Sequence, residues 1–310
     1  MPPGLGDVHV DRAMTEFSLA YGNDEASFIA EAIFPMIPVA KESDKYFKHD
    51  KQNLRAENDG PRGVREPSRE ASYGLSTGSY TLGIYNLNDL VPDRIRANAD
   101  QPLDPDRRCV RNITDKLLVG KEIRAAAIAF DTADITQYTT LTGTDQWSDF
   151  TNSDPLDDIE VGIQNVRTKT GRMPNHIVMG AAVWSKLKFH PQLIERIKYV
   201  SGAGLTVAQV ASIVDIPDIT VGLAVKNTAN ENQTDVIANI WGKACLVQYR
   251  NTSPAPESGG MGFTIRRRAD REVRTWREKN PQGDRFEVEM SYTFELVDDT
   301  FGYLIDAAVA

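Results

Sequence analysis

A 30-residue stretch in which half of the residues are charged places the strongest constraint on how this chain can fold. Residues 41–70 contain eight lysines and arginines and seven aspartates and glutamates, with two glycines and two prolines among them. So few apolar side chains leave little to bury, and we expect such a stretch to be solvated on its own. Because strand-like runs flank it, at 45–48 and 80–85, we predict a two-stranded arm with a polar tip. An isolated hairpin is marginal in water, so the arm should need something to lie against; a disordered linker is the alternative.

The chain as a whole has a globular composition. Its 310 residues correspond to about two domains. With 41% hydrophobic and 25% charged residues, wholesale disorder is excluded. The net charge of −9 argues against a general binder of DNA or anionic membranes, because both carry negative charge. No secretory signal opens the chain, and the apolar stretch 26–40 is too short to span a bilayer. We therefore expect an intracellular protein without a membrane partner.

Two long elements are predicted. A helix over 104–130 begins with Asp104 as cap and Pro105 in the first turn, and its apolar residues follow helical spacing. It would be a rod of roughly 40 Å. Gly120 lies in mid-helix and marks a bend or a close contact, or is simply tolerated. Apolar residues then alternate over 286–296, which predicts a half-buried strand paired across a turn with 273–279.

Shorter elements are predicted elsewhere. In the segment 34–39 (FPMIPV), two prolines exclude a central strand, so it is either an apolar ribbon on a surface or an edge segment of the protein's own core. A short helix over 27–33 should end before Pro35. From 154 onward helices and strands alternate, and the last predicted pair is a hairpin of 235–241 with 244–249.

Signatures of catalysis are missing from the sequence. There is no phosphate-binding loop, GxSxG motif or HExxH motif, and the four histidines are scattered. Cys109 and Cys245 form no CxxC and fit apolar positions, so both are predicted as core residues. We therefore predict no catalytic residues, no metal site and no cofactor.

Six arginines cluster near the C-terminal hairpin. They are Arg266, Arg267, Arg268, Arg271, Arg274 and Arg277. With Trp276 among them they could bind nucleic acid. Against this, Asp270, Glu272 and Glu278 are interleaved and the whole chain is acidic. Salt bridges to neighbouring acidic surfaces are the favoured interpretation, and phosphate contact is the second.

Several segments together resemble a known family. They are FPMIPV at 34–39, the polar arm at 41–85, LVPDRIRANAD at 90–100, SDPLDDI from 153, GRMPNHIVMGAAVWSKLKFHPQLIERIKY at 171–199 and the closing strand–turn–strand. In this order they are similar to the major capsid proteins of tailed bacteriophages, which have the Hong Kong ninety-seven-type fold. The matched elements cover nearly the whole chain. The resemblance specifies architecture rather than chemistry.

The resemblance implies an α+β fold in which a long spine helix packs on a long β-hairpin, beside a mixed-sheet domain flanked by helices. It implies an N-terminal arm at 1–42 and an extended loop at 43–91. A peripheral domain would comprise 92–153 and 265–297, with the spine helix at 104–130 and the hairpin at 271–297. An axial domain would comprise 154–264 and 298–310.

The resemblance also implies partners. The chain would assemble with itself into pentamers and hexamers of an icosahedral shell that encloses double-stranded DNA without binding it specifically. Because the chain starts almost directly at the arm, we expect a separate scaffold or a segment already removed; portal and decoration proteins are further partners. It would lie in the virion capsid, after assembly in the host bacterial cytoplasm. Lys45, Lys48 and Lys51 lie where some relatives form cross-links, but no motif supports that chemistry here.

Candidate inter-subunit contacts follow from the charged arm and the arginine cluster. They are Lys45, Lys48, Lys51, Arg55, Glu57, Arg62, Arg65, Glu66, Arg69, Arg267, Arg271 and Arg274. Gly120 is the hinge candidate, because a precursor shell that expands would need the rod to move. Two alternatives remain: an α/β enzyme with a site near the loops at 171–205, and a binding module that uses the arginines at 266–277.

Overall fold

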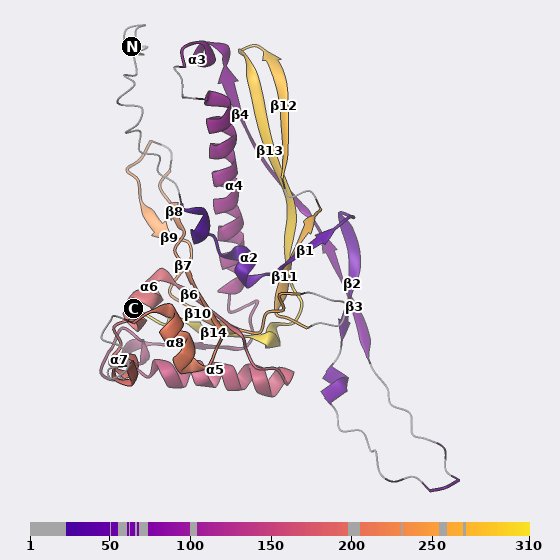
Figure 1. Cartoon of the computed structure of the whole chain (residues 1–310), viewed down its shortest axis with the longest axis vertical. Helices are drawn as coiled ribbons and strands as arrows, with labels where there is room; N and C mark the ends of the chain where they lie inside the picture. Colours follow the sequence, from indigo (N-terminus) through magenta and orange to yellow (C-terminus); the bar gives the residue numbers. More distant parts are fainter. Residues whose placement is uncertain are drawn as a thin grey trace.

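The structure is a computed structural model in which a long helix stands upright on a body of sheet and helices (Figure 1). It describes residues 23–49, 51–54, 61, 63–65, 67, 74–99, 104–197, 205–230, 232–253, 259–268 and 271–310. Residues 1–22 of the predicted N-terminal arm therefore lie outside the described residues.

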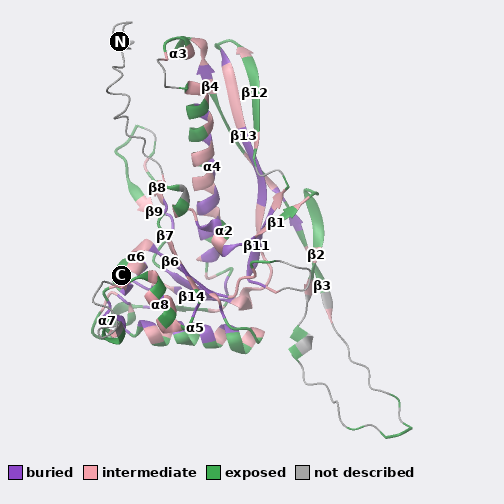
Figure 2. Ribbon diagram, in the orientation of Figure 1, coloured by how far each residue is buried: buried purple, intermediate pink, exposed green. Residues whose placement is uncertain are grey.

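A five-stranded mixed sheet forms the centre of the body. Its strand order is β5 (Tyr138–Thr140), β14 (Gly302–Asp306), β10 (Cys245–Gln248), β6 (His176–Gly180) and β7 (Asp218–Gly222). β6 and β7 run parallel, which requires a crossover connection. Three helices make it: α6 (Ala181–Leu187), α7 (Pro191–Ile197) and α8 (Val207–Val214). All residues of β6 and β10 are buried, so the centre of this sheet is covered on both faces, whereas the edge strand β5 is exposed (Figure 2).

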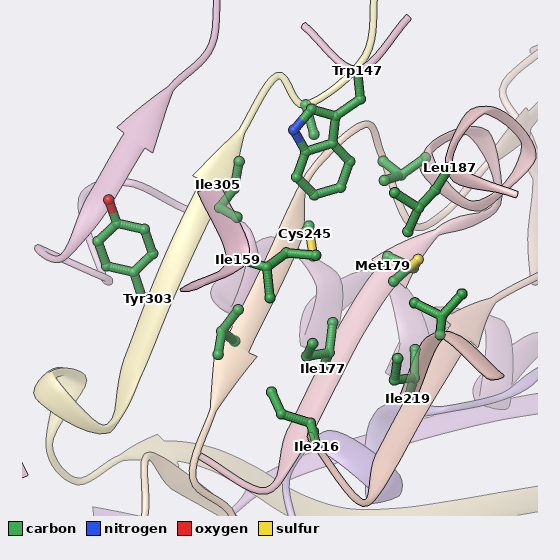
Figure 3. Packing of buried hydrophobic residues seen from close by; sticks show 14 of the residues in the cluster. Trp147, Ile159, Ile177, Met179, Leu187, Ile216, Ile219, Cys245, Tyr303 and Ile305 are labelled. Atoms are coloured by element: carbon green, nitrogen blue, oxygen red, sulfur yellow. The ribbon is translucent and has the colours of Figure 1, made fainter. Parts of the chain in front are cut away.

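Alternation along these strands divides the core between the two faces. Ile177 and Met179 of β6 join a cluster with Ile159 of α5 (Pro155–Thr170), and Figure 3 shows these side chains packed together. Val178, between them, points to the other face and joins a second cluster with Phe34 and with small residues of the long helix. This follows from the two-residue period of a strand.

The long helix α4 (Pro105–Ala129) confirms the predicted rod. The Asp104 side chain accepts hydrogen bonds from the backbone N–H groups of Asp106 and Arg107, and Pro105 occupies the first turn. Its first half packs through Cys109, Ile113 and Leu117 against apolar residues of β13 and β4. Its last turns reach the mixed sheet. One helix therefore backs two sheets.

A second sheet, which we call the hairpin sheet, stands beside α4 (Figure 1). It is built on the central strand β13 (Gln282–Leu296), which pairs antiparallel with β12 (Glu272–Lys279), β4 (Gly83–Pro92) and β11 (Gly262–Arg267). The predicted long hairpin is confirmed. β1 (Met36–Val39) adds to β11 in parallel at the edge.

The remaining elements are short. β2 (Ser43–His49) and β3 (Leu75–Thr81) form the two-stranded arm, and β8 (Val225–Asn227) and β9 (Ile237–Asn239) form a small hairpin. Two further α-helices are α2 (Ala30–Ile33) and α3 (Asp93–Ala97). Single 3-10 turns are η1 (Glu25–Ser27), η2 (Lys51–Leu54), η3 (Gly143–Asp145) and η4 (Asp299–Phe301).

Some local predictions were wrong. Strand β9 pairs with β8, whereas β10 is inserted between β14 and β6, so the predicted hairpin of 235–241 with 244–249 does not form. All four residues of β10 are buried, which suits a central strand better than a hairpin arm. The helix predicted over 27–33 is reduced to α2. The segment 34–39 takes the edge alternative, since β1 contains Pro38 and lies at a sheet edge.

Candidate assembly surfaces

The arm projects away from the body and carries exposed apolar side chains (Figures 1 and 2). β2 and β3 pair over seven residues, and the base of the arm packs through Tyr80 and Leu82 on Ile265 of β11. Beyond this base, Phe47 is 60% exposed and Leu54 is 60% exposed. The protein's own body therefore anchors the arm but leaves these two side chains mostly exposed. The charge-based prediction missed these apolar side chains.

The predicted contact residues of the arm are partly described. Lys45 is exposed on β2, and the ammonium of Lys48 lies 5.7 Å from the centre of the Tyr46 ring. Lys51 donates a hydrogen bond of 2.8 Å to Thr300 Oγ1. Arg65 is exposed. The others, Arg55, Glu57, Arg62, Glu66 and Arg69, lie outside the described residues.

The arginine cluster is interleaved with carboxylates of its own chain. Arg267 lies 3.6 Å from Glu272. Arg274 lies 3.0 Å from the same carboxylate and 3.3 Å from Glu289, across on β13. Arg271 stands just before β12 and is also engaged in an interaction. These pairs leave an alternating surface of both signs, which does not favour the nucleic-acid-binding alternative.

The tip of the hairpin sheet is held by an ion-pair network. Arg96 of α3 lies 2.8 Å from Asp106 of α4 and 2.8 Å from Asp284 of β13. Arg277 of β12 pairs with Asp284 at 3.3 Å and with Asp93 of α3. Hydrogen bonds from Arg277 and Arg96 lower the pKa of Asp93 and Asp284 respectively. The network joins the long helix to the hairpin, and α3, which sequence reasoning missed, supplies two of its members.

A buried polar junction joins the N-terminal segment, the long helix and the mixed sheet. Glu122 of α4 is 2% exposed, and its two carboxylate oxygens accept hydrogen bonds from the Ala30 N–H at 2.7 Å and from the Trp241 indole N–H at 2.9 Å. Burial raises the pKa of Glu122, against the lowering effect of those bonds. Beside it, Lys121 pairs with Glu31 at 2.5 Å. In the sequence, the adjacent charged residues Lys121 and Glu122 interrupt the apolar side of the helix, and this was the signal that could have revealed the junction.

Side chains hold the other polar groups of this N-terminal segment. Arg250 donates to the Ala32 carbonyl at 2.6 Å, Gln248 donates to the Ile33 carbonyl at 3.3 Å, and Thr264 donates to the Phe34 carbonyl at 2.8 Å. Gln248 lies in the mixed sheet and Thr264 in the hairpin sheet. Residues 30–34 therefore lie between the two sheets and are hydrogen-bonded to both.

The two histidines near the loops at 171–205, His176 and His190, are hydrogen-bonded to neighbouring side chains of the fold. His176 Nε2 lies 2.8 Å from Thr220 Oγ1, and Nδ1 lies 2.8 Å from Gln248 Nε2, so both ring nitrogens are engaged. Burial lowers the pKa of His176 to about 3. His190 contacts Ser153 Oγ at 3.1 Å. The Ser153 hydroxyl donates its proton to the Asp149 carbonyl at 2.5 Å. The hydroxyl proton therefore does not point toward the imidazole of His190, as it would if His190 were to act as a base on Ser153. This arrangement does not favour the enzyme alternative.

Within the described residues, no group of three or more His, Cys, Asp or Glu side chains is placed to hold a metal ion. Over the same part of the chain, every helix is too short or too polar to cross a membrane.

Comparisons with known proteins agree with the fold. A family model described as phage major capsid protein E matches residues 115–248. The major capsid protein of Burkholderia phage BcepMu is 28% identical over 274 residues, covering 86% of each chain. That of Pseudomonas phage JBD67 is 25% identical and covers 78% of this chain and 77% of its own.

Solved structures have the same architecture. A phage-related protein from Bordetella bronchiseptica aligns with a TM-score of 0.73 at 24% identity, over 92% of this chain and 94% of that protein. The capsid of cyanophage P-SCSP1u aligns with a TM-score of 0.63 at 10% identity, over 99% of this chain and 95% of that protein. The fold is therefore the α+β capsid fold of Hong Kong ninety-seven type. The relatives are named for a structural role, in agreement with the prediction that the chain is not an enzyme. These matches support a major capsid protein of the tailed-bacteriophage type, a structural protein of the virion's shell.

Proposed function

We propose that the chain assembles into pentamers and hexamers, which close into an icosahedral shell around double-stranded phage DNA. The observation that carries the proposal is the arm, on which Phe47 and Leu54 each remain 60% exposed although the arm is anchored to the body. A two-stranded hairpin is marginal in water, so a neighbouring copy is the surface that would stabilise it. Because the chain has a net charge of −9 and DNA is also negatively charged, the shell would enclose DNA without binding it specifically.

The domain organisation follows the same proposal. The N-terminal arm is 1–42, the extended loop 43–91, the peripheral domain 92–153 with 265–297, and the axial domain 154–264 with 298–310. Strands β6, β7, β10 and β14 of the mixed sheet support the axial assignment, and α4 with β12 and β13 supports the peripheral one. Strands β5 and β4 cross the proposed boundaries, because β5 joins the mixed sheet and β4 pairs with β13. Gly120 is the proposed hinge of α4, although the helix is continuous through it.

The charged residues of the arm and the arginine cluster are proposed as contacts between copies. Exposed ion pairs are individually weak and sensitive to salt, which suits contacts that form and rearrange during assembly. Many weak contacts acting together in a closed shell give high overall stability. We further propose a separate scaffold, portal and decoration proteins as partners, and assembly in the host bacterial cytoplasm.

Electron microscopy of the expressed chain tests the proposal. We expect capsomers, sheets, tubes or closed particles, and a persistent monomer in all conditions would contradict it. Deletion of residues 50–75 removes the charged segment between β2 and β3. The variant should keep the circular dichroism and melting of the full chain yet assemble poorly. Normal particles from the deletion variant would remove the arm from the assembly contacts.

A further inference from the structure

Strand β12 is an open edge of the hairpin sheet. In the described part of the chain it pairs along its whole length with β13 and with no other strand, and Figure 1 shows it on the outer side of the sheet. The backbone N–H and C=O groups along this free edge can pair with a further strand. Val273 is 53% exposed and Trp276 is 39% exposed, so the edge also carries apolar surface.

The side chains of β12 divide between two faces of the sheet. Val273 lies opposite Val288 of β13, which is buried against α4, so the odd-numbered residues of β12 lie on the helix side. The even-numbered residues lie on the open face, in the order Glu272, Arg274, Trp276 and Glu278. An arginine therefore precedes the exposed tryptophan by two residues, and a glutamate follows it by two. This pattern is complementary to itself when two strands run in opposite directions.

Symmetry restricts how two copies of β12 can pair. A two-fold axis perpendicular to the sheet keeps every residue on its own face, so each antiparallel register is centred on one residue that opposes its equivalent. Registers that pair at least five of the eight residues are centred on Arg274, Thr275, Trp276 or Arg277. Centring on Arg274 or Arg277 opposes two arginines, and centring on Thr275 opposes Glu272 to Glu278.

Only the register centred on Trp276 opposes unlike charges. It places Arg274 of each copy against Glu278 of the other and the two tryptophans against each other, on the open face. Opposite charges and aromatic pairs in directly opposed positions are the pairs that stabilise antiparallel strands. Within its own chain, Arg274 lies 3.3 Å from Glu289, and Glu278 lies 2.7 Å from Arg285. The new pairs would join these into one row of alternating charge across both sheets.

The other strand edge of the hairpin sheet fits β12 less well. Strand β4 also pairs only with β13 among the described residues. On the open face it presents Ile84, Asn86, Asn88 and Leu90, which are all uncharged. A neighbouring β4 would therefore leave Arg274 and Glu278 without opposite charges. The charge pattern selects a second β12 as the partner.

We propose that β12 pairs with β12 of a second copy in the register centred on Trp276, which joins two hairpin sheets into one. The inference deepens the proposed assembly by naming one contact, and such a dimer can also form without a shell. One pair of strands is a small interface beside the roughly 1,200–2,000 Å² of a stable complex. The contact should therefore be weak between free subunits and strengthened where many contacts act together.

Cysteine cross-linking of the full-length chain tests the register. Val273 of one copy would oppose Lys279 of the other, and both are exposed. Opposed Cβ atoms lie about 4.5–5.5 Å apart, near the separation that a disulfide spans. An equimolar mixture of Val273→Cys and Lys279→Cys chains should give a disulfide-linked dimer on oxidation, seen on a non-reducing gel. The native Cys109 and Cys245 are buried.

Each cysteine variant alone is the matched control. In the proposed register, residue 273 lies six positions, or about 20 Å, from its equivalent in the other copy, and so does residue 279. Neither variant alone should therefore form the dimer. Adding Arg274→Glu to both chains should lower the yield of the mixture about tenfold, because like charges then face each other. Adding Glu278→Arg as well should restore the yield, which damage to the fold would not do.

The cross-link is measured on concentrated unassembled subunits and on any particles that form. Absence of the mixed dimer in both would overturn the inference, whereas particles would still support shell formation. A mixed dimer without particles would support edge pairing and count against the shell. A dimer of Val273→Cys with Arg277→Cys in place of Lys279→Cys would overturn the register, and one with Leu87→Cys would assign the edge to β4. If a charge variant fails to melt cooperatively, the cysteine mixture decides, since it keeps both charges and Trp276.

Discussion

The mixed sheet and the hairpin sheet bury their side chains in different ways. In the mixed sheet every residue of β6 and β10 is buried, because helices or the α4 end cover both faces. In the hairpin sheet α4 covers one face only. The opposite face carries ion pairs such as Arg274–Glu289 and Arg285–Glu278, and the edge strand β12 is largely exposed. The centre of the mixed sheet is therefore covered within the chain, whereas the face of the hairpin sheet opposite α4 and its edge strand β12 leave much of their surface exposed.

This difference in burial suggests different roles for the two sheets, one in the stability of the single subunit and the other in contacts outside it. Burial of apolar surface is the dominant stabilising term, so the mixed sheet should carry most of the stability of a single subunit. Exposed ion pairs contribute little alone, so the hairpin sheet gains from contacts outside the subunit. A shell protein needs both a body that survives before assembly and a surface that gains from it.

The largest expected effect compares one residue from each sheet. Ile177→Ala removes a fully buried side chain of β6 and should cost about 2–5 kcal/mol of unfolding free energy. Val273→Ala on β12 should cost less than about 0.5 kcal/mol, because Val273 is 53% exposed. Urea unfolding of unassembled subunits, followed by tryptophan fluorescence, measures both. Equal costs would mean that the edge of the hairpin sheet is as well packed as the mixed sheet.

The second prediction concerns the junction between the sheets. Glu122→Gln replaces two acceptor oxygens by one, so the amide opposes either the Ala30 N–H or the Trp241 indole N–H. We expect a loss of about 1–2 kcal/mol at neutral pH. In the variant, amide hydrogen exchange should become faster in α2 while that of β6 keeps its original rate, because residues 30–34 are released while the mixed sheet stays folded. Simultaneous release of both would contradict a separable junction.

The same variant gives a pH test with a definite sign. Because burial raises the pKa of Glu122 in the folded chain, the folded state holds its proton more tightly than the unfolded state. Stability of the original chain should therefore fall, relative to the Gln variant, as pH rises from the ordinary glutamate pKa of 4.5 toward the raised value. A difference in unfolding free energy that stays constant, or grows, over this range would show that Glu122 is not desolvated.

Sequence periodicity predicted the elements that depend on local pattern. The cap and apolar spacing of α4 and the alternation of β13 are written in neighbouring residues, so both were found with nearly correct ends. The partner of β10 could not be found in this way. Its four apolar residues fit any buried strand, and only the tertiary structure places them between β14 and β6.

The candidate surfaces divide along the same line. The strand-like runs at 45–48 and 80–85, on either side of the charged stretch, predicted the arm, although its second strand β3 lies at Leu75–Thr81. The tip network and Glu122 junction were missed, because they join residues that are far apart in sequence: Arg96 with Asp284, and Glu122 with Ala30 and Trp241.

The smallest expected effect compares two helical glycines, one behind each sheet. An added Cβ at Gly120 of α4 would come no closer than 3.4 Å, and only to the flexible guanidinium of Arg124. Gly120→Ala should therefore raise the unfolding free energy by about 0.5–1 kcal/mol, since alanine restricts the unfolded chain. At Gly162 of α5 the Cβ would meet the Tyr303 ring at 3.0 Å and Val247 at 3.3 Å, inside the mixed-sheet core. Gly162→Ala should leave the unfolding free energy unchanged or lower it.

Thermal melts of the two variants in one buffer measure this difference. If both glycines respond alike, the looser packing inferred behind the hairpin sheet is wrong. If Gly120→Ala is more stable yet gives fewer closed particles, flexibility at this position is needed for assembly, as expected of a hinge.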